Sequence, residues 1–136
     1  MQDPWTRFGT LEPDETYLVL ASSIPARRYA ATPAIFRGSR AVKRQLAQTP
    51  GVKGFSLLAR PLRKRYASLS EWSGENALAT FVASEPHRYL MERLGPQMAP
   101  TTFVRWTIRG GDGRPRWREA LRRLEAAEQG EVTSTS

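Results

Sequence analysis

The chain has 136 residues, of which 40% are hydrophobic and 25% are charged, and this composition is typical of one folded domain. It contains no cysteine, which excludes a disulfide scaffold, thiolate metal ligands and a cysteine nucleophile. The net charge of +8 is unevenly distributed, because residues 16–70 hold eleven lysines and arginines and no acidic residue. A region of one sign attracts anions, so this segment is a candidate surface for an anionic partner.

The first part of the chain predicts an arm, a strand and a helix. Residues 1–15 contain two prolines and four acidic residues without a sustained hydrophobic period, and we interpret them as an N-terminal arm. The apolar run over residues 17–24 predicts a strand. Apolar side chains then recur at helical spacing and predict a helix over residues 33–48.

A pair of strands follows, over residues 55–60 and 66–72, with a basic turn between them. In the second strand Tyr66, Ser68, Ser70 and Trp72 point one way, whereas Ala67 and Leu69 point the other. The small apolar pair predicts packing under a helix. The row of aromatic and hydroxyl side chains predicts a second, partly polar face.

The last part of the chain predicts two short helices, a strand and a final helix. The first helix begins near Ser73 and the second at Pro86, because a proline interrupts a helix that contains it. Residues 101–108 predict the last strand. Apolar side chains at helical spacing over residues 117–124 predict a short amphipathic helix.

The predicted order, β-α-β-β-α-β, is typical of the ferredoxin-like α+β fold, in which helices cover one face of a four-stranded antiparallel sheet. We place this domain at residues 16–124, between the arm of residues 1–15 and a polar tail of residues 125–136. Such a sheet leaves its other face bare, and burial of that face against a second copy predicts a homodimer. The row from Tyr66 to Trp72 would then lie on this face and line a cavity.

The segment SEWSGENALATFVASEPH, from Ser70 to His87, resembles the middle of the antibiotic-biosynthesis-monooxygenase-like proteins. Trp72 matches their strand-borne tryptophan, and His87 matches the histidine in the turn after their helix. Residues 51–55 are similar to the beginning of their second strand, and residues 115–124 resemble a bacterial branch of the superfamily. The resemblance implies a dimeric α/β barrel, with cofactor-independent oxidation of polycyclic phenols in some members and haem degradation in others.

Two positions differ from the haem-degrading members. Their first strand carries an asparagine, which the strand of residues 17–24 lacks, and Val82 stands where they carry a haem-ligating histidine. We therefore expect no haem cofactor and no haem degradation. Nothing in the sequence indicates a flavin, so we expect the protein to work without a cofactor.

His87 and Tyr66 are the candidate catalytic residues. The imidazole of His87 has an ordinary pKa near neutrality and can act as a general base. The hydroxyl of Tyr66 can donate a proton to a substrate oxygen. Each also has a structural interpretation, because a histidine in the first turn of a helix often caps or packs, and the face of Tyr66 can equally be a dimer interface.

The candidate substrate-binding residues are Trp72, Ser68, Ser70 and Arg60. Trp72 can stack on a planar substrate or belong to the core. The two serines can hold a substrate by hydrogen bonds or lie in a dimer interface. Arg60 can bind an anionic group bidentately if it points inward, or lie on the surface beside the basic turn.

The sequence thus favours a monooxygenase or a binding protein for a small aromatic compound, either neutral or anionic. The alternative is a non-catalytic module that binds nucleic acid through residues 27–65, with a salt-sensitive affinity. A structural dimer without catalysis is the third interpretation. The longest apolar run near the N-terminus, residues 17–21, is too short for a signal peptide or a membrane span, so we expect a cytoplasmic protein that does not bind a membrane.

Overall fold

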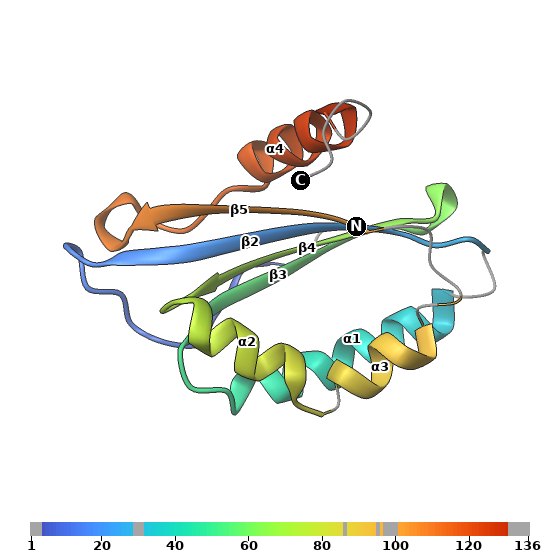
Figure 1. Cartoon of the computed structure of the whole chain (residues 1–136), viewed down its shortest axis with the longest axis horizontal. Coiled ribbons are helices and arrows are strands. Elements are labelled where there is room, and N and C mark those ends of the chain that lie inside the picture. The colour runs from blue at the N-terminus through green and yellow to red at the C-terminus, as the bar shows by residue number, and fades with distance from the viewer. Residues whose placement is uncertain (1–3, 29–31, 86, 95, 97–100, 131–136) are drawn as a thin grey trace.

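The computed structural model describes residues 4–28, 32–85, 87–94, 96 and 101–130 (Figure 1). These residues form an antiparallel sheet of five strands in the order β1-β3-β4-β2-β5. The strands are β1 (Thr6–Arg7), β2 (Thr16–Pro25), β3 (Val52–Arg60), β4 (Arg65–Trp72) and β5 (Thr102–Arg109). The helices are α1 (Thr32–Ala47), α2 (Glu75–Ala83), α3 (His87–Leu94) and α4 (Trp117–Gly130), with 3₁₀ turns η2 (Pro61–Arg63) and η4 (Gly110–Asp112).

The centre of the sheet is β4, which pairs with β3 on one side and with β2 on the other. β2 also pairs with β5, which is therefore an edge strand of the sheet. The connection from β3 to β4 is tight, because Pro61 opens η2 and Lys64 adopts the left-handed conformation at φ 53°. The bounds of β2, β4 and β5 agree with the predicted ones within a residue or so, and β3 begins earlier than predicted, at Val52.

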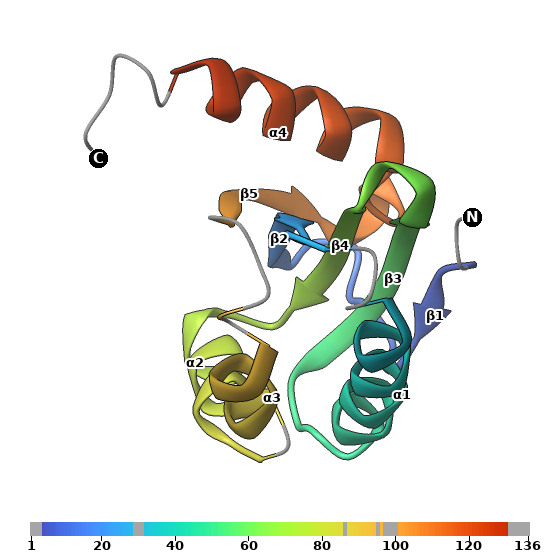
Figure 2. The same ribbon diagram turned by 90° about the vertical axis from the view of Figure 1, so that its right-hand side faces the viewer.

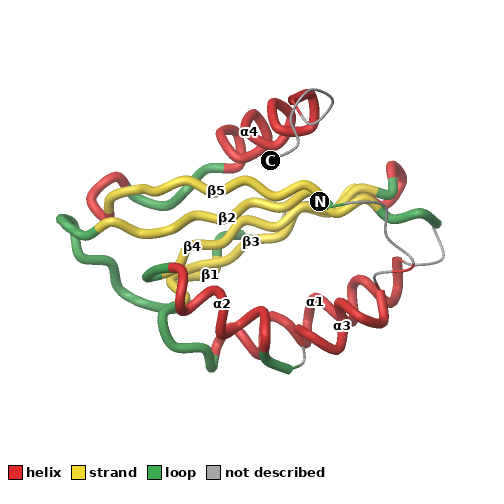
Figure 3. Tube along the Cα trace, viewed as in Figure 1, coloured by secondary structure: helices red, strands yellow, loops and turns green. Residues whose placement is uncertain are grey.

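Helices cover both faces of the sheet: α1, α2 and α3 lie on one face and α4 lies on the other (Figures 1 and 2). Figure 3 shows the strands as the middle of three layers. The ferredoxin-like α+β class is confirmed, with two additions to the predicted pattern. The short strand β1 extends the sheet at the β3 edge, and α4 covers the face that we expected to be bare.

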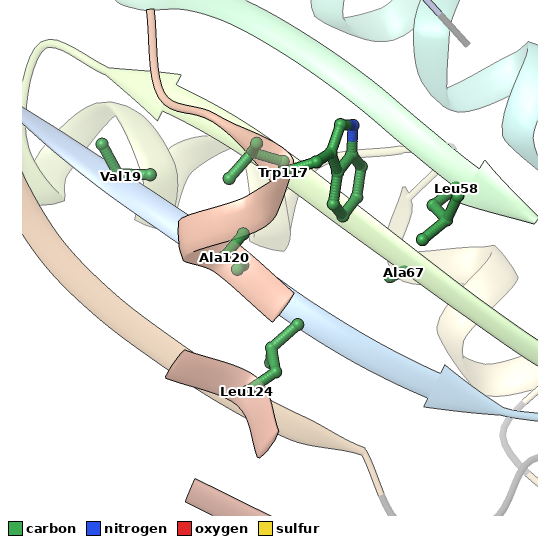
Figure 4. Packing of buried hydrophobic residues seen from close by; sticks show 8 residues of the cluster. Val19, Leu58, Ala67, Trp117, Ala120 and Leu124 are labelled. Carbon is green, nitrogen blue, oxygen red and sulfur yellow. The ribbon is translucent and has the colours of Figure 1, made fainter. Parts of the chain in front are cut away.

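The core under α4 is a continuous apolar layer. Val19, Ala21, Leu58, Ala67 and Leu69 of the sheet meet Trp117, Ala120 and Leu124 of the helix (Figure 4). The indole Nε1 of Trp117 donates a hydrogen bond to the Ser56 hydroxyl at 2.9 Å, which fixes the beginning of α4 on β3. α4 continues to Gly130, past residue 124 where we placed the end of the domain, and residues 131–136 of the predicted tail lie outside the described residues.

The core under α1, α2 and α3 consists of two separate apolar clusters. The larger cluster contains Leu18, Leu46, Val52, Phe55, Trp72, Leu78 and Phe81. The smaller cluster contains Ala26, Ile35, Ala59 and Tyr66. The predicted alternation of β4 therefore holds, but its two faces are exchanged: Tyr66 and Trp72 lie under α1–α3, and Ala67 and Leu69 lie under α4.

The break between α2 and α3 lies where the sequence predicted it. α2 ends at Ala83 and α3 begins at His87. Pro86, the predicted first residue of the second helix, lies outside the described residues, as does Gly95 at its predicted end.

Candidate functional site

A strip of serine hydroxyls separates the two apolar clusters on the face under α1–α3. Ser22 of β2 and Ser68 of β4 are opposite one another, and their hydroxyls are hydrogen-bonded. The hydroxyl of Ser70 donates to the Leu20 carbonyl at 3.4 Å and accepts the indole N–H of Trp72 at 2.8 Å. We call Ser22, Ser68 and Ser70 the hydroxyl strip.

The helices do not close tightly over the middle of this face. Leu20, Leu57 and Ser68 are only half-buried, although they lie on inner strands of the sheet. On the neighbouring edge strand, Phe103 points to the same side and 62% of its surface is exposed. Ser68 is therefore the half-buried member of the hydroxyl strip, whereas Ser22 and Ser70 are buried, at 3% and 4% exposure.

His87 lies at the Trp72 end of this face. Its ring packs on Phe81 with 4.9 Å between centroids, and Phe81 packs on Trp72 with 5.2 Å between centroids. Burial lowers the pKa of His87, and a hydrogen bond with the Val82 carbonyl partly offsets this effect. Because a carbonyl only accepts, the Nδ1 atom that lies 3.3 Å from Val82 O carries the proton, and Nε2 keeps its lone pair.

Gln45 of α1 fixes the position of His87. Its side-chain oxygen accepts the backbone N–H of His87 at 2.9 Å, and its amide nitrogen donates to the carbonyls of Phe81 and Ser84 at 3.1 and 3.4 Å. One side chain therefore binds the end of α2 and the beginning of α3 together. No local sequence pattern indicates this role, because Gln45 and His87 are 42 residues apart.

The structure brings some of the predicted site residues together and separates others. Ser68, Ser70 and Trp72 are neighbours on one face, and the indole of Trp72 is only 2% exposed. Tyr66 lies at the other end of β4, about 20 Å from Trp72 at the usual rise of a strand. It is buried in the smaller cluster, with its ring against Phe36 at 6.3 Å between centroids. His87 and Tyr66 thus lie at opposite ends of the face.

Arg60 is not part of this face. It is exposed at the end of β3, and the alternation of that strand places it on the side of Ser56 and Leu58, which face α4. The cation beside the hydroxyl strip is instead Arg105 of β5, which is opposite Leu20 and forms an ion pair with Glu75 of α2 at 2.6 Å. The alternation of the strand predicted over residues 101–108 could have identified Arg105, had the pairing with β2 been known.

Glu71 is the other residue that the sequence did not single out. It is fully buried on the α4 side of β4, and neither carboxylate oxygen has a hydrogen-bond partner among the described residues. The indole of Trp5 lies on Gly54, the residue opposite Glu71, where there is no room for a side chain. Burial raises the pKa of Glu71, and the positive charges of Arg7 and Lys53 partly offset this effect.

The part of the chain that the structure describes contains neither a cluster of metal ligands nor a membrane-spanning helix. Nowhere in that part of the chain do three histidine, aspartate or glutamate side chains cluster as metal ligands would. Among the helices described, none is long and apolar enough to cross a membrane.

The comparison with known proteins rests on structure, since no family model matches the chain and no curated protein matches it by sequence. Its fold is that of the antibiotic-biosynthesis-monooxygenase-like proteins with a ferredoxin-like fold, as the sequence resemblance predicted. At identities of 16% and below, this similarity shows the fold alone.

Three solved structures illustrate the similarity. A mutant of SnoaB, a cofactor-independent oxygenase from Streptomyces nogalater, superposes with a TM-score of 0.54 at 16% identity, covering 68% of this chain and 93% of SnoaB. An antibiotic biosynthesis monooxygenase gives a TM-score of 0.60 at 16% identity, with 65% and 95% of the chains covered. A dimeric ferredoxin-like protein from Thermobifida fusca gives 0.59 at 14% identity, with 73% and 97% covered.

Proposed function

We propose that the chain is a monooxygenase-like enzyme that oxidises an electron-rich aromatic compound with dioxygen and without a cofactor. The observation that carries the proposal is the hydroxyl strip between two apolar clusters, with Ser68 half-buried, in a fold shared with the cofactor-independent oxygenase SnoaB. Hydroxyls on an otherwise apolar sheet can orient a phenol by hydrogen bonds while the apolar surroundings bind its ring.

In this proposal the aromatic ring lies over Ser68, between the half-buried side chains of Leu20 and Leu57. The hydroxyls of Ser22 and Ser68 bond to each other, which leaves one O–H that can donate to a phenolate oxygen and lone pairs that can accept a phenolic O–H. An anionic substrate would gain from Arg105, which is opposite Leu20 on β5, if it replaces Glu75 as the partner of the guanidinium.

His87 is the general base of the proposal, acting at the Trp72 end of the face. Its lowered pKa keeps the imidazole neutral at neutral pH, and Nε2 is free to take a proton because Nδ1 is bound to Val82. Tyr66, at the opposite end, is the second candidate for moving a proton, for a substrate that lies nearer the smaller cluster.

The proposed reaction balances without any further reductant. Removal of the phenolic proton gives a phenolate, which transfers electrons to dioxygen and forms a carbon–oxygen bond at an activated ring carbon. The O–O bond then breaks, one oxygen stays on the ring as the second carbonyl of a quinone, and the other leaves as water. The two hydrogens of that water come from the phenol O–H and the ring C–H, and all four electrons come from the substrate.

We also propose that the enzyme is a homodimer. The similar protein from Thermobifida fusca is dimeric, and here the large exposed side chain of Phe103 is opposite Ser22 of the hydroxyl strip. A second copy that covers this flank would bury Phe103 and shield the substrate from water. Light scattering of the wild type and of Phe103→Glu at micromolar concentration tests this assembly, because the charge would separate the subunits.

Dioxygen consumption with a panel of polycyclic phenols and hydroquinones tests the oxygenase proposal, with ¹⁸O₂ to follow one labelled oxygen into the product. Loss of the base in His87→Ala should lower kcat by about a hundredfold or more. Ser68→Ala should raise KM, whereas Thr80→Ala, on the exposed surface of α2, should change neither constant. Turnover that is unaffected by His87→Ala and by Tyr66→Phe would contradict the assignment of both proton carriers.

Polyanion binding through residues 27–65 is a second proposal, supported by one observation. Arg37, Arg40 and Arg44 are all exposed on α1, and α1 contains no acidic residue. Such a stripe suits the phosphates of a nucleic acid. Affinity for single-stranded DNA that falls steeply with salt in the wild type, and is lost in the triple Arg→Gln variant of this stripe, would support the alternative.

A further inference from the structure

A groove of about 430 Å³ runs beside the edge strand β5, where the chain enters α4. One wall is the strand itself, from Trp106 to Arg109, and the other is the segment from Arg114 to Arg116 with the first turns of α4. A volume of this size is within the range of small-molecule sites. The proposed oxygenase reaction does not use it.

Buried side chains hold the wall that contains Arg114 and Arg116, called the arginine wall below, against the rest of the protein. Pro115 and Trp117 are buried, whereas Arg114, Arg116 and Arg118 are exposed, so alternate residues hold the segment down and present guanidinium groups to solvent. The Trp117 indole is bound to Ser56 at 2.9 Å, and Gly113 turns the chain before the segment at φ 83°, a conformation that favours glycine. The arginines are therefore presented by a fixed backbone, which lowers the entropy lost on binding.

Some charged side chains around the groove form ion pairs and others do not. Arg109 lies 3.5 Å from the fully exposed carboxylate of Asp14. Glu119 is bound by Arg122 and Arg123 at 3.6 and 2.9 Å, and Asp112 lies at the edge of the groove. The guanidinium groups of Arg114 and Arg116, in contrast, have no ion pair or hydrogen bond with any residue that the structure describes.

Trp106 and Ile108 give the groove an apolar part. Trp106 and Ile108 of β5 are half-buried and point toward α4, and the guanidinium of Arg123 lies 4.6 Å from the centre of the Trp106 ring. A ligand that fits this surface needs a flat apolar body for Trp106 and Ile108 and an anionic group for the arginine wall.

We infer that this groove is a binding site for a small organic anion with an aromatic body, either an aryl phosphate or an aryl carboxylate. Arg114 and Arg116 bind the anionic group, and the ring lies along Trp106 and Ile108. A second copy that pairs edge to edge with β5 fits this groove less well, whereas the homodimer proposed above contacts the Phe103 side of the strand, on the opposite face. Pairing of two β5 edges would bring the exposed Arg105 and Arg109 of both copies close together, and like charges on paired strands are destabilising.

The test is a titration of the ¹⁵N-labelled full chain with phenyl phosphate and benzoate, with inorganic phosphate and benzyl alcohol as the anion-only and ring-only probes. The indole N–H signal of Trp106 is assigned by its loss in Trp106→Phe. We expect phenyl phosphate or benzoate to shift this signal and to bind more tightly than inorganic phosphate, and we expect benzyl alcohol to leave it unchanged. Stronger binding of one aryl anion than the other identifies the headgroup.

Matched variants separate this site from general basic charge. Arg114→Glu/Arg116→Glu should weaken binding by about tenfold or more, since it removes the charged donors of the wall. Arg37→Glu/Arg44→Glu makes the same charge change on α1, across the sheet, and should leave the affinity unchanged. Equal weakening by both pairs, equal binding of inorganic phosphate and phenyl phosphate, or no shift of Trp106 would overturn the site. Because neither pair touches the hydroxyl strip, dioxygen consumption should be the same in both.

Discussion

The two faces of the sheet are built on different principles. The face under α4 is a single apolar layer, interrupted by the carboxylate of Glu71 and the Ser56 hydroxyl that binds Trp117. The face under α1, α2 and α3 holds two apolar clusters with serine hydroxyls between them, and its centre is half exposed. A mainly apolar layer contributes mainly stability, whereas hydroxyls among half-buried apolar side chains on a rigid sheet can bind and orient a ligand. The comparison therefore assigns stability to the α4 face and proposed chemistry to the other.

The largest expected effect comes from the tryptophan in the core of each face. Trp117→Ala and Trp72→Ala should each lower the free energy of unfolding by about 3–5 kcal/mol, because both side chains are buried and both indoles are hydrogen-bonded. Urea unfolding measures both. A Trp72→Ala variant as stable as the wild type would show that Trp72 lines an open cavity rather than the core.

The phenylalanine variants sharpen this result. Trp117→Phe keeps most of the apolar contact but removes the indole hydrogen bond to the buried Ser56 hydroxyl, so we expect a loss of about 1 kcal/mol. A loss as large as that of Trp117→Ala would contradict the role of packing on this face.

Glu71→Gln tests how much the buried carboxylate on the α4 face lowers the free energy of unfolding. The pKa of Glu71 is raised in the folded state, so its contribution to stability is fully present below the ordinary value of 4.5 and is lost as pH rises through the folded value. The neutral variant should therefore unfold at a higher urea concentration than the wild type at pH 7, and the two should converge in acid. Identical pH profiles would mean that Glu71 is solvated.

His87 should show the opposite pH dependence. Its pKa is lowered in the folded state, so its contribution is present above the ordinary value of 6.5 and is lost as pH falls through the folded value. The chain has one histidine, and a single imidazole signal in an NMR titration reports the folded pKa directly. His87→Gln should remove this part of the pH dependence of stability, while Gln45→Ala should bring the pKa of His87 nearer to 6.5 by loosening α3.

The smallest effect is expected in the hydroxyl strip. Ser68→Ala should cost about 1 kcal/mol, because it leaves the buried Ser22 hydroxyl without its partner. Ser22→Ala/Ser68→Ala removes both hydroxyls and should be closer to neutral. A double variant that is less stable than the sum of the single ones would show that the strip supports the fold rather than a ligand.

The sequence by itself determined the elements and their order. Strong hydrophobic periods gave β2, β4, β5 and α1, and proline placed the break between α2 and α3, because these signals are local. The sequence did not predict the short strand β1, since its two residues are exposed and carry no hydrophobic period. They pair with β3 next to the place where the Trp5 indole packs on Gly54. The hydroxyl and aromatic row of β4 was likewise read correctly as one face.

Only the tertiary structure decided which helix covers which face. Alternation along a strand divides its residues into two sets, one on each face of the sheet. Both sets of β4 are compatible with packing under a helix. Which set lies under which helix depends on the face of the sheet against which α4 packs after β5. With α4 on this face, Ala67 and Leu69 lie under α4 and Arg60 lies on the opposite side of the sheet from the hydroxyl strip, while Arg105 lies beside the strip. The tertiary structure also joined Gln45 to His87 across 42 residues, a contact that no local pattern encodes because it depends on how α1 packs beside α3.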